Sequence, residues 1–391
     1  MKIVQFSNYI NHHQIPLANA FNHIPGVEYI FVATTPFNNQ RAAMGYEDAN
    51  SKYEFVLRAY EGADKERQAH CLAKDADIVI VGSAPDTYMA ERLDIGKVTF
   101  HTSERYFKKG LSIKTFPRYF ASAMKHIRRY QNTPLYYLCA SAYTAKDVNT
   151  FSNFRERCFK WAYFTDVQDF DEEYLLRKQV NKERPEILWA GRFLDWKHPE
   201  AAIHIAERLR EQGFNFKLRL IGGGNMELQL KSMVEKKHIE DNVCFLGYLP
   251  PAKVRKHMEE TDIFLFTSDF NEGWGAVLNE AMSSGCAVIS SHAPGAAPYL
   301  VRDGENGFLY KNGDENDLFE KTKLLLSDNK KRKSFGLNAY NTVKNTWNAD
   351  VAANRLITLH DVLNSGDSKH VFSDGPCSPA EILGNGWYCK K

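Results

Sequence analysis

The stretch DIFLFTSDFNEGWGAVLNEAMSSGCAVISS, residues 262–291, holds the pattern that decides the fold. A short apolar run at 263–266 is typical of a buried strand, a polar loop follows it, and residues 275–284 have the spacing of an amphipathic helix. A second apolar run follows at 287–290. Apolar strands separated by helices indicate a parallel sheet covered on both faces, and such sheets bind ligands outside the carboxyl ends of their strands.

The same alternation runs through the whole chain and predicts an α/β protein with two doubly wound, Rossmann-like domains facing each other across a cleft. The charged stretch 166–185 is the best candidate for a linker, which gives an N-terminal domain at 1–165 and a second domain at 186–348. The expected strands are 3–6, 29–33, 78–81, 98–101, 135–140 and 159–163 in the first domain, and 187–190, 218–221, 243–246, 263–266 and 287–290 in the second.

Composition excludes several classes of protein. The chain has 391 residues, of which 43% are hydrophobic and 25% charged, with a formal net charge of +2, so it is neither disordered nor fibrous. No apolar run approaches the ~20 residues of a membrane-spanning helix, and no secretory signal pattern is visible, so we expect a cytoplasmic protein. The seven Cys are scattered without a C-x2-C pair, which predicts neither a disulfide framework nor a zinc site.

Two carboxylates flank the glycine-rich part of the quoted stretch. Gly273 and Gly275 let the backbone approach a ligand closely, and the following helix offers unpaired N–H donors. Glu272 and Glu280 would lie two helical turns apart, where they can take the hydroxyls of a polyhydroxylated ligand. The alternatives are a charge at a helix N-terminus for Glu272 and an ordinary solvated residue for Glu280.

Two further loops follow predicted strands of the second domain. Arg192 and Lys197 suit a diphosphate, or else are solvated loop cations. The turn Gly222-Gly223-Gly224 permits close approach. Neither G-x-G-x-x-G after the first strand nor G-x-x-x-x-G-K-[ST] occurs, which disfavours a dinucleotide oxidoreductase and a P-loop nucleotidase. The D-x-D triplets at 75–77 and 169–171 lie in a strand-entry loop and in the charged linker, and neither resembles a metal site.

Residues 186–313 resemble the C-terminal half of the retaining glycosyltransferases of family 4, which have the GT-B fold. The resemblance rests on the spacing Glu272-x7-Glu280 together with the quoted stretch and four other landmarks: WAGRFLDWK (189–197), LIGGG (220–224), VCFLGYLP (243–250) and YLVRDGENGFLY (299–310).

The resemblance implies a retaining hexosyltransferase that needs neither metal nor cofactor. Glu280 would bind the ribose of a nucleotide-sugar donor, Glu272 with the backbone of 273–275 would meet the donor sugar, and Arg192 and Lys197 would neutralise the diphosphate. The full donor set implied is Arg192, Lys197, Gly222, Gly223, Tyr248, Glu272, Gly273, Trp274, Gly275, Ala276, Val277 and Glu280. Sugar choice is expected to depend on side chains around Trp274 and on the first domain.

The N-terminal half is less diagnostic. His101, at the end of a predicted strand, matches a His near the reaction centre of similar enzymes and completes the implied catalytic set with Glu272, Arg192 and Lys197. The family usually continues with Asp where this chain has Thr102, and a core or loop-capping His is the alternative. Acceptor hydroxyls would meet Asn11, His12 and His13, which otherwise cap the next helix.

A basic segment at 105–129 carries no Asp or Glu and interleaves its cations with aromatic residues. This pattern suits an anionic membrane surface, and the alternative is a solvated helix whose aromatic residues belong to the core. The residues expected at the membrane are Lys108, Lys109, Lys114, Arg118, Lys125, Arg128 and Arg129. By the GT-B resemblance, residues 349–391 would form a helix and tail that cross back to the N-terminal domain.

These observations favour a retaining glycosyltransferase of surface polysaccharide or glycan biosynthesis. It would transfer a sugar from a UDP-linked donor to a saccharide or a lipid-linked saccharide by same-face attack. We expect it on the cytoplasmic side, with the basic segment attaching it peripherally to the membrane. Alternatives are a non-catalytic subunit that binds sugar nucleotides, a GT-B-like epimerase, and a soluble glucan or sucrose-type synthase. A nucleic-acid partner is not expected, because the chain is nearly neutral and carries no such motif.

Overall fold

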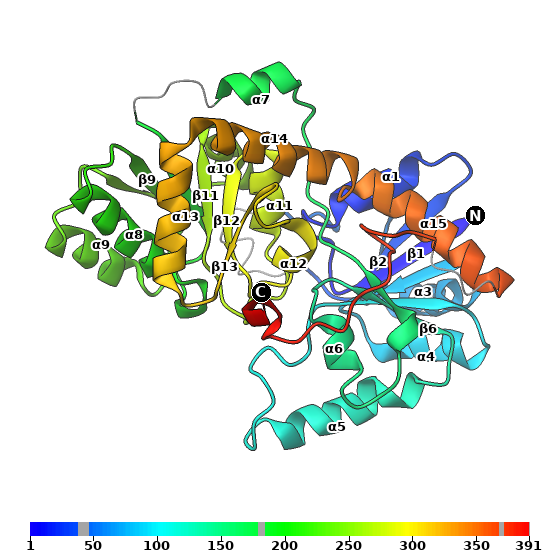
Figure 1. Ribbon diagram of the computed structural model, residues 1–391. Coiled ribbons are helices and arrows are strands. Elements are labelled where there is room, and N and C mark those ends of the chain that lie inside the picture. The colour runs from blue at the N-terminus through cyan, green and yellow to red at the C-terminus, as the bar shows by residue number, and fades with distance from the viewer. Residues whose placement is uncertain (38–46, 179–183, 367–370, 391) are drawn as a thin grey trace. The chain divides into compact units, whose positions relative to one another are not determined.

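The computed structural model describes residues 1–37, 47–178, 184–366 and 371–390. The chain forms two compact units (Figure 1). Unit 1 contains Met1–Asp166 and Trp347–Gly384, and unit 2 contains Val167–Thr346 and Asn385–Lys391. Each unit is a parallel sheet with helices, so the predicted α/β class with two Rossmann-like sheets is confirmed.

Unit 1 is built on a seven-stranded parallel sheet in the order β3-β2-β1-β4-β5-β6-β7. The central strands are buried apolar runs, which is why they lie inside the sheet. The strands are β1 (Lys2–Ser7), β2 (Glu28–Ala33), β3 (Val56–Arg58), β4 (Ile78–Val81), β5 (Thr99–Ser103), β6 (Leu135–Cys139) and β7 (Cys158–Lys160). The short edge strand β3 was not predicted, because three half-buried residues give no periodic signal.

Helices cover this sheet, and the last long helix of the chain packs against the first (Figure 1). They are α1 (Ile15–His23), α3 (Ala63–Asp75), α4 (Asp86–Asp94), α5 (Phe116–His126), α6 (Thr144–Val148) and α15 (Ala349–Ser365). Beyond α15, residues 377–380 run along the outer edge of β7: Cys377 N donates to Lys160 O (2.9 Å) and Ala380 N donates to Cys158 O (2.9 Å). This pairing covers a strand edge that would otherwise be free to pair with another chain.

Unit 2 is built on a six-stranded parallel sheet in the order β10-β9-β8-β11-β12-β13. Its core gathers apolar side chains of the strands and of the helices that cover them, among them Trp189, Leu220 and Leu265. The strands are β8 (Glu186–Ala190), β9 (Lys217–Ile221), β10 (Val243–Gly247), β11 (Ile263–Phe266), β12 (Ala287–Ser291) and β13 (Gly307–Tyr310). The helices are α7 (Glu172–Lys178), α8 (Pro199–Glu211), α9 (Glu227–Lys236), α10 (Pro251–Glu260), α11 (Ala276–Ser283), α12 (Ala297–Leu300), α13 (Glu315–Ser327) and α14 (Asn329–Asn345).

Two segments differ from the expectations. The stretch 166–185, expected to be a linker, contains α7, and the Nζ of Lys178 at the end of this helix donates to Met258 O (2.8 Å) and Ser284 O (2.6 Å). Residues 179–183 of the same stretch lie outside the described part of the chain. The end of the tail does not pack on the N-terminal half as expected, because Tyr388 donates to Leu309 O (2.6 Å) and stacks on His292, both in unit 2. Among the described helices, none has the length and hydropathy needed to cross a membrane.

Candidate active site

The candidate residues of unit 2 lie on loops that leave adjacent strands. Strands β9, β8 and β11 are neighbours in the sheet and run parallel, so the loops that follow them meet at one edge. These loops carry Arg192 and Lys197 after β8, the glycine triplet after β9, and Glu272 after β11. The topology therefore gathers residues that are up to 80 positions apart in the sequence.

Lys197 and Glu272 form an ion pair at this edge, from Nζ to Oε2. Each side chain is only 12% exposed, and Ser268 Oγ donates a further hydrogen bond to the same carboxylate oxygen (3.0 Å). Lys197 Nζ also lies 4.6 Å from the ring centroid of Trp196. A charge this buried is costly without a partner, and here each group supplies the opposite charge for the other.

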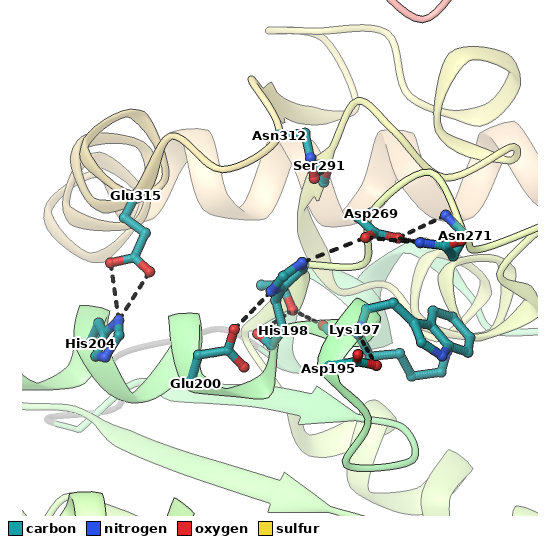
Figure 2. A network of polar contacts seen from close by, with 12 residues as sticks. Asp195, Lys197, His198, Glu200, His204, Asp269, Asn271, Ser291, Asn312 and Glu315 are labelled. Atoms are coloured by element: carbon teal, nitrogen blue, oxygen red, sulfur yellow. Dashed lines mark hydrogen bonds and ion pairs between the residues drawn. The ribbon is translucent and has the colours of Figure 1, made fainter. Parts of the chain in front are cut away.

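A second polar cluster ties the same two loops together (Figure 2). His198 lies between two carboxylates: its Nδ1 is 2.7 Å from Glu200 Oε1, and its Nε2 is 3.8 Å from Asp269 Oδ2. Hydrogen bonding to Asp269 and then to Glu200 raises the pKa of His198 to about 10, although burial opposes the shift. The imidazole is therefore a cation at neutral pH, next to the lysine that pairs with Glu272.

Two glycines allow the backbone to pass closely at this edge. Gly222 has φ +132°, and a Cβ there would lie 1.8 Å from the carbonyl oxygen of Gly191. Gly275 has φ +97°, and a Cβ there would lie 2.3 Å from the ring of Phe266. Tyr248, 61% exposed, covers the glycine turn and donates from its hydroxyl to Gly223 O (2.9 Å). Only glycine fits the first two positions, which agrees with the predicted close approach of backbone and ligand.

Trp274 turns away from the edge. Its side chain is fully buried, and its Nε1 donates to Asn279 Oδ1 (2.8 Å) in α11. This indole is held in the core of unit 2, and the expectation that the choice of sugar depends on side chains around Trp274 stays a prediction. Gly273 is buried as well, while Ala276 and Val277 are half-buried in the first turn of α11.

Glu280 lies two turns along α11, as its spacing from Glu272 requires. Burial raises its pKa to about 7, and the nearby guanidinium of Arg255 acts in the opposite direction. Arg255 itself donates to the backbone oxygen of Glu280 (2.6 Å) and to the Ser283 hydroxyl (2.8 Å). Arg192 is exposed, and its guanidinium forms no ion pair within the described part of the chain.

The remaining candidates belong to unit 1. His101 is the middle residue of β5, which continues to Ser103 and so extends beyond the end expected from the sequence. Its Nε2 is 3.1 Å from the Tyr106 hydroxyl, and burial lowers its pKa, so the ring is neutral at pH 7. Asn11 Oδ1 accepts from His13 N (3.0 Å), and the Asn11 N–H donates to Gln14 Oε1 (3.0 Å) in a turn just ahead of α1. The N-cap residue of α1 is Gln14, so Asn11 shapes this turn without capping the helix. The rings of His12 and His13 lie against each other with centroids 3.6 Å apart.

Sequence reasoning missed four residues that build this edge: Thr267, Ser268, Asp269 and His198. Three of them stand inside the quoted stretch and the fourth follows Lys197 directly. These residues could have been found from the sequence because each lies close to a candidate residue, and hydroxyl and carboxylate groups in such loops often form hydrogen bonds to neighbouring backbone groups. Thr267 shows this role most clearly, because its hydroxyl accepts from Trp189 Nε1 (2.8 Å) and contacts the Lys197 carbonyl (2.6 Å).

Comparison with known proteins agrees with this geometry. Residues 171–342 match the profile of the family described as "Glycosyl transferases group 1". The matched region makes up most of unit 2. It contains the Lys197–Glu272 pair, the glycine turn and Glu280. The finer assignment to family 4 stays a prediction.

Two curated relatives each match about a third of the chain. The "Amylovoran biosynthesis glycosyltransferase AmsK" of Erwinia amylovora is 34% identical over 133 residues, covering 33% of this chain and 32% of that protein. The "Putative colanic acid biosynthesis glycosyltransferase WcaL" of Escherichia coli is 31% identical over 141 residues, covering 35% and 34%. The alignments thus span about a third of the length of these relatives.

Solved structures extend the likeness of the fold to almost the whole chain. Anabaena Alr3699/HepE in complex with UDP has a TM-score of 0.65 at 17% identity and covers 93% of this chain and 100% of its own. WaaG, "a glycosyltransferase involved in lipopolysaccharide biosynthesis", has a TM-score of 0.61 at 14% identity and covers 94% and 100%. The two-unit α/β architecture is therefore the GT-B fold of these glycosyltransferases.

Proposed function

We propose that this protein transfers a sugar from a nucleotide-diphosphate sugar, most simply a UDP-sugar, to a saccharide or lipid-linked saccharide in the synthesis of a surface polysaccharide. The observation that carries the proposal is the Lys197–Glu272 pair at the carboxyl edge of the unit 2 sheet, beside the exposed Arg192. AmsK and WcaL are named for amylovoran and colanic acid biosynthesis, which supports the polysaccharide context, and the UDP in the HepE structure supports the donor.

The residues suit the charges of such a donor. A diphosphate arriving at the edge would take over Lys197 and Arg192, and would release the Glu272 carboxylate to accept hydroxyl groups of the donor sugar. Glu280 would accept the ribose hydroxyls. As the glycosidic bond breaks, negative charge grows on the leaving diphosphate, and the two cations stabilise it without the need for a divalent ion.

Retention of configuration follows if the acceptor attacks from the face that the diphosphate leaves. The acceptor oxygen forms its bond to the anomeric carbon while the bond from that carbon to the phosphate oxygen breaks, and the hydroxyl proton passes to the departing diphosphate. In this mechanism no side chain forms a covalent intermediate. Neutral His101 and the pair His12 and His13 are the unit 1 residues that we assign to sugar and acceptor hydroxyls.

The test is release of nucleoside diphosphate from a panel of UDP-, GDP- and ADP-sugars, with lipid-linked saccharide extract as acceptor and with EDTA present. Lys197→Ala and Glu272→Ala should abolish release, whereas Lys236→Ala, an exposed lysine of α9, should leave it unchanged. Binding of a nucleotide sugar without any release would identify the chain as a non-catalytic subunit. A trapped glycosyl-enzyme would contradict the same-face mechanism.

The proposal also places the protein at an anionic membrane surface through the segment 105–129. Apolar side chains of this segment are unusually exposed: Ile113 is 96%, Phe116 46%, Leu111 45% and Phe120 41% exposed. The rings of Phe116 and Phe120 stack with centroids 5.7 Å apart. Exposed aromatic and aliphatic groups among cations suit the headgroup region of a membrane, where each cation contributes about 1 kcal/mol.

The structure separates the cations of this segment into two groups. Lys108 pairs with Glu104 (2.6 Å) and Arg129 lies 3.8 Å from Asp86, so these two are partly neutralised. We therefore expect Lys109, Lys114 and Arg118 to contribute most of the attraction. Co-sedimentation with phosphatidylglycerol vesicles should fall at least tenfold in the triple Glu variant. Equal binding of that variant, or equal binding to neutral phosphatidylcholine vesicles, would contradict the membrane proposal.

A further inference from the structure

His198 has a backbone conformation that residues with side chains rarely adopt. Its φ is +49° and its ψ is +53°, in the left-handed region, directly between Lys197 and the first residue of α8. Among the described residues, the others with positive φ that are not glycine are His238 and Cys377. Glycine would adopt this conformation at no steric cost. A histidine at this position therefore indicates that contacts of its side chain compensate for the backbone strain.

The side chain joins two loops (Figure 2). Its two ring nitrogens face Glu200, at the start of α8, and Asp269, on the loop that leads to Glu272. The Asp269 carboxylate is held in place by the backbone N–H of Asn271 (2.7 Å) and by its side-chain amide (3.0 Å). The His198 ring therefore lies between a fixed helix end and a fixed carboxylate.

The backbone around His198 makes the same connection. Thr267 Oγ1 is 2.6 Å from the carbonyl oxygen of Lys197 and 2.9 Å from that of His198, and Asp269 N donates to Trp196 O (2.9 Å). The turn that carries Lys197 is thus held against the loop after β11 at several points. The imidazole adds a charged contact, because the carboxylates of Asp269 and Glu200 on its two sides favour its protonated form.

We propose that His198 is a positioning residue: its imidazolium clamps the turn of Lys197 to the Asp269 loop, and so holds the Lys197 ammonium where a donor diphosphate would meet it. This inference rests on the proposed function for its consequence in catalysis. The clamp itself is a property of unit 2 and can be tested without turnover.

The first variant is His198→Gly, which accepts the left-handed backbone and removes only the clamp. The matched control is His238→Gly, because His238 also has a left-handed φ (+50°) and lies at the end of α9, away from the candidate site. We expect the melting temperature to fall by no more than about 4 °C in His198→Gly and to stay unchanged in His238→Gly. Only His198→Gly should lose about tenfold in kcat/KM, mainly through a higher KM for the donor, since a misplaced Lys197 binds the diphosphate less well.

Two further measurements separate positioning from a general structural role. Acetylation of Lys197, followed by mass spectrometry under limiting reagent, should be at least threefold faster in His198→Gly than in the wild type or in His238→Gly. Asp269→Asn should have the same effect, and the double variant should be no worse than either single one, because both changes remove one contact. If His198→Gly and His238→Gly show equal Lys197 acetylation, the clamp is refuted. If acetylation changes but no donor is turned over by the wild type, the clamp stands and the proposed function fails.

Discussion

Gly275 offers the sharpest test of how the candidate site is built into the fold. Replacing it with Ala adds a Cβ that would lie 2.3 Å from Cζ and 2.9 Å from Cε1 of Phe266, a buried ring at the end of β11. The same Cβ would lie 3.3 Å from Cγ of Glu272. Since Phe266 and Glu272 belong to one loop and strand end, the added methyl group would displace the residues that carry the site.

The cost has two parts. A left-handed backbone costs an Ala roughly 1–2 kcal/mol, and overpacking a buried ring costs roughly 1–3 kcal/mol, so the free energy of unfolding should fall by about 3 kcal/mol. Gly304→Ala is the matched control, because Gly304 also has a positive φ (+84°) but open space around its Cβ position. That variant should lose only the backbone part, about 1 kcal/mol.

Urea unfolding followed by tryptophan fluorescence measures both values in the full chain. The two variants should differ by about 2 kcal/mol, and Gly275→Ala should also bind UDP more weakly. If both lose the same stability within about 0.5 kcal/mol, Phe266 does not confine Gly275 and the account of this edge is incorrect.

Three further predictions concern titration and packing. With a pKa of about 7, Glu280 is mostly protonated at pH 6, so UDP affinity measured by calorimetry should fall about tenfold from pH 8 to pH 6, and Glu280→Gln should lose that part of the pH dependence. The pKa of His198 is raised from its unfolded value of 6.5 to about 10, so its stabilisation of the fold is complete below pH 6.5 and disappears as the pH rises to 10. Because the side chain is 39% exposed, we expect this stabilisation to be only about 1 kcal/mol. Urea unfolding at pH 6 and pH 10 should show this difference in the wild type and not in His198→Gly. Trp274→Phe leaves the buried Asn279 Oδ1 without its donor and should lower the free energy of unfolding by about 2 kcal/mol, whereas loss of a solvated contact would cost almost nothing.

Local patterns predicted the parts of the fold that local forces decide. Apolar runs such as 263–266 and 287–290 became β11 and β12 because a strand buried on both faces needs nothing else in its sequence. The glycines at 222 and 275 were informative for a related reason, since their backbone conformations admit no other residue. The 3.6-residue period likewise placed Glu280 on the helix that begins beside Glu272.

Contacts between distant segments were beyond such reasoning. The direction of the Trp274 side chain is set by Asn279 and the surrounding core, and nothing in the spacing of the loop distinguishes inward from outward. The pairing of Lys197 with Glu272 joins residues 75 positions apart. The helix α7 could not be predicted from its charged stretch, because Lys178 at its end is held by the carbonyl oxygens of Met258 and Ser284, which are distant in the sequence.

The path of the chain through its two units has a consequence for how the protein is made. Unit 2 is almost continuous in sequence, at 167–346, so nearly all of it is available while the ribosome is still translating α15. Unit 1 must wait, because the face of α1 is covered by α15 and the edge of β7 by residues 377–380. During synthesis, therefore, the half that is translated first is the half that finishes folding last. Its open strand edge is then the point at which a nascent chain is most exposed to aggregation and most dependent on chaperones.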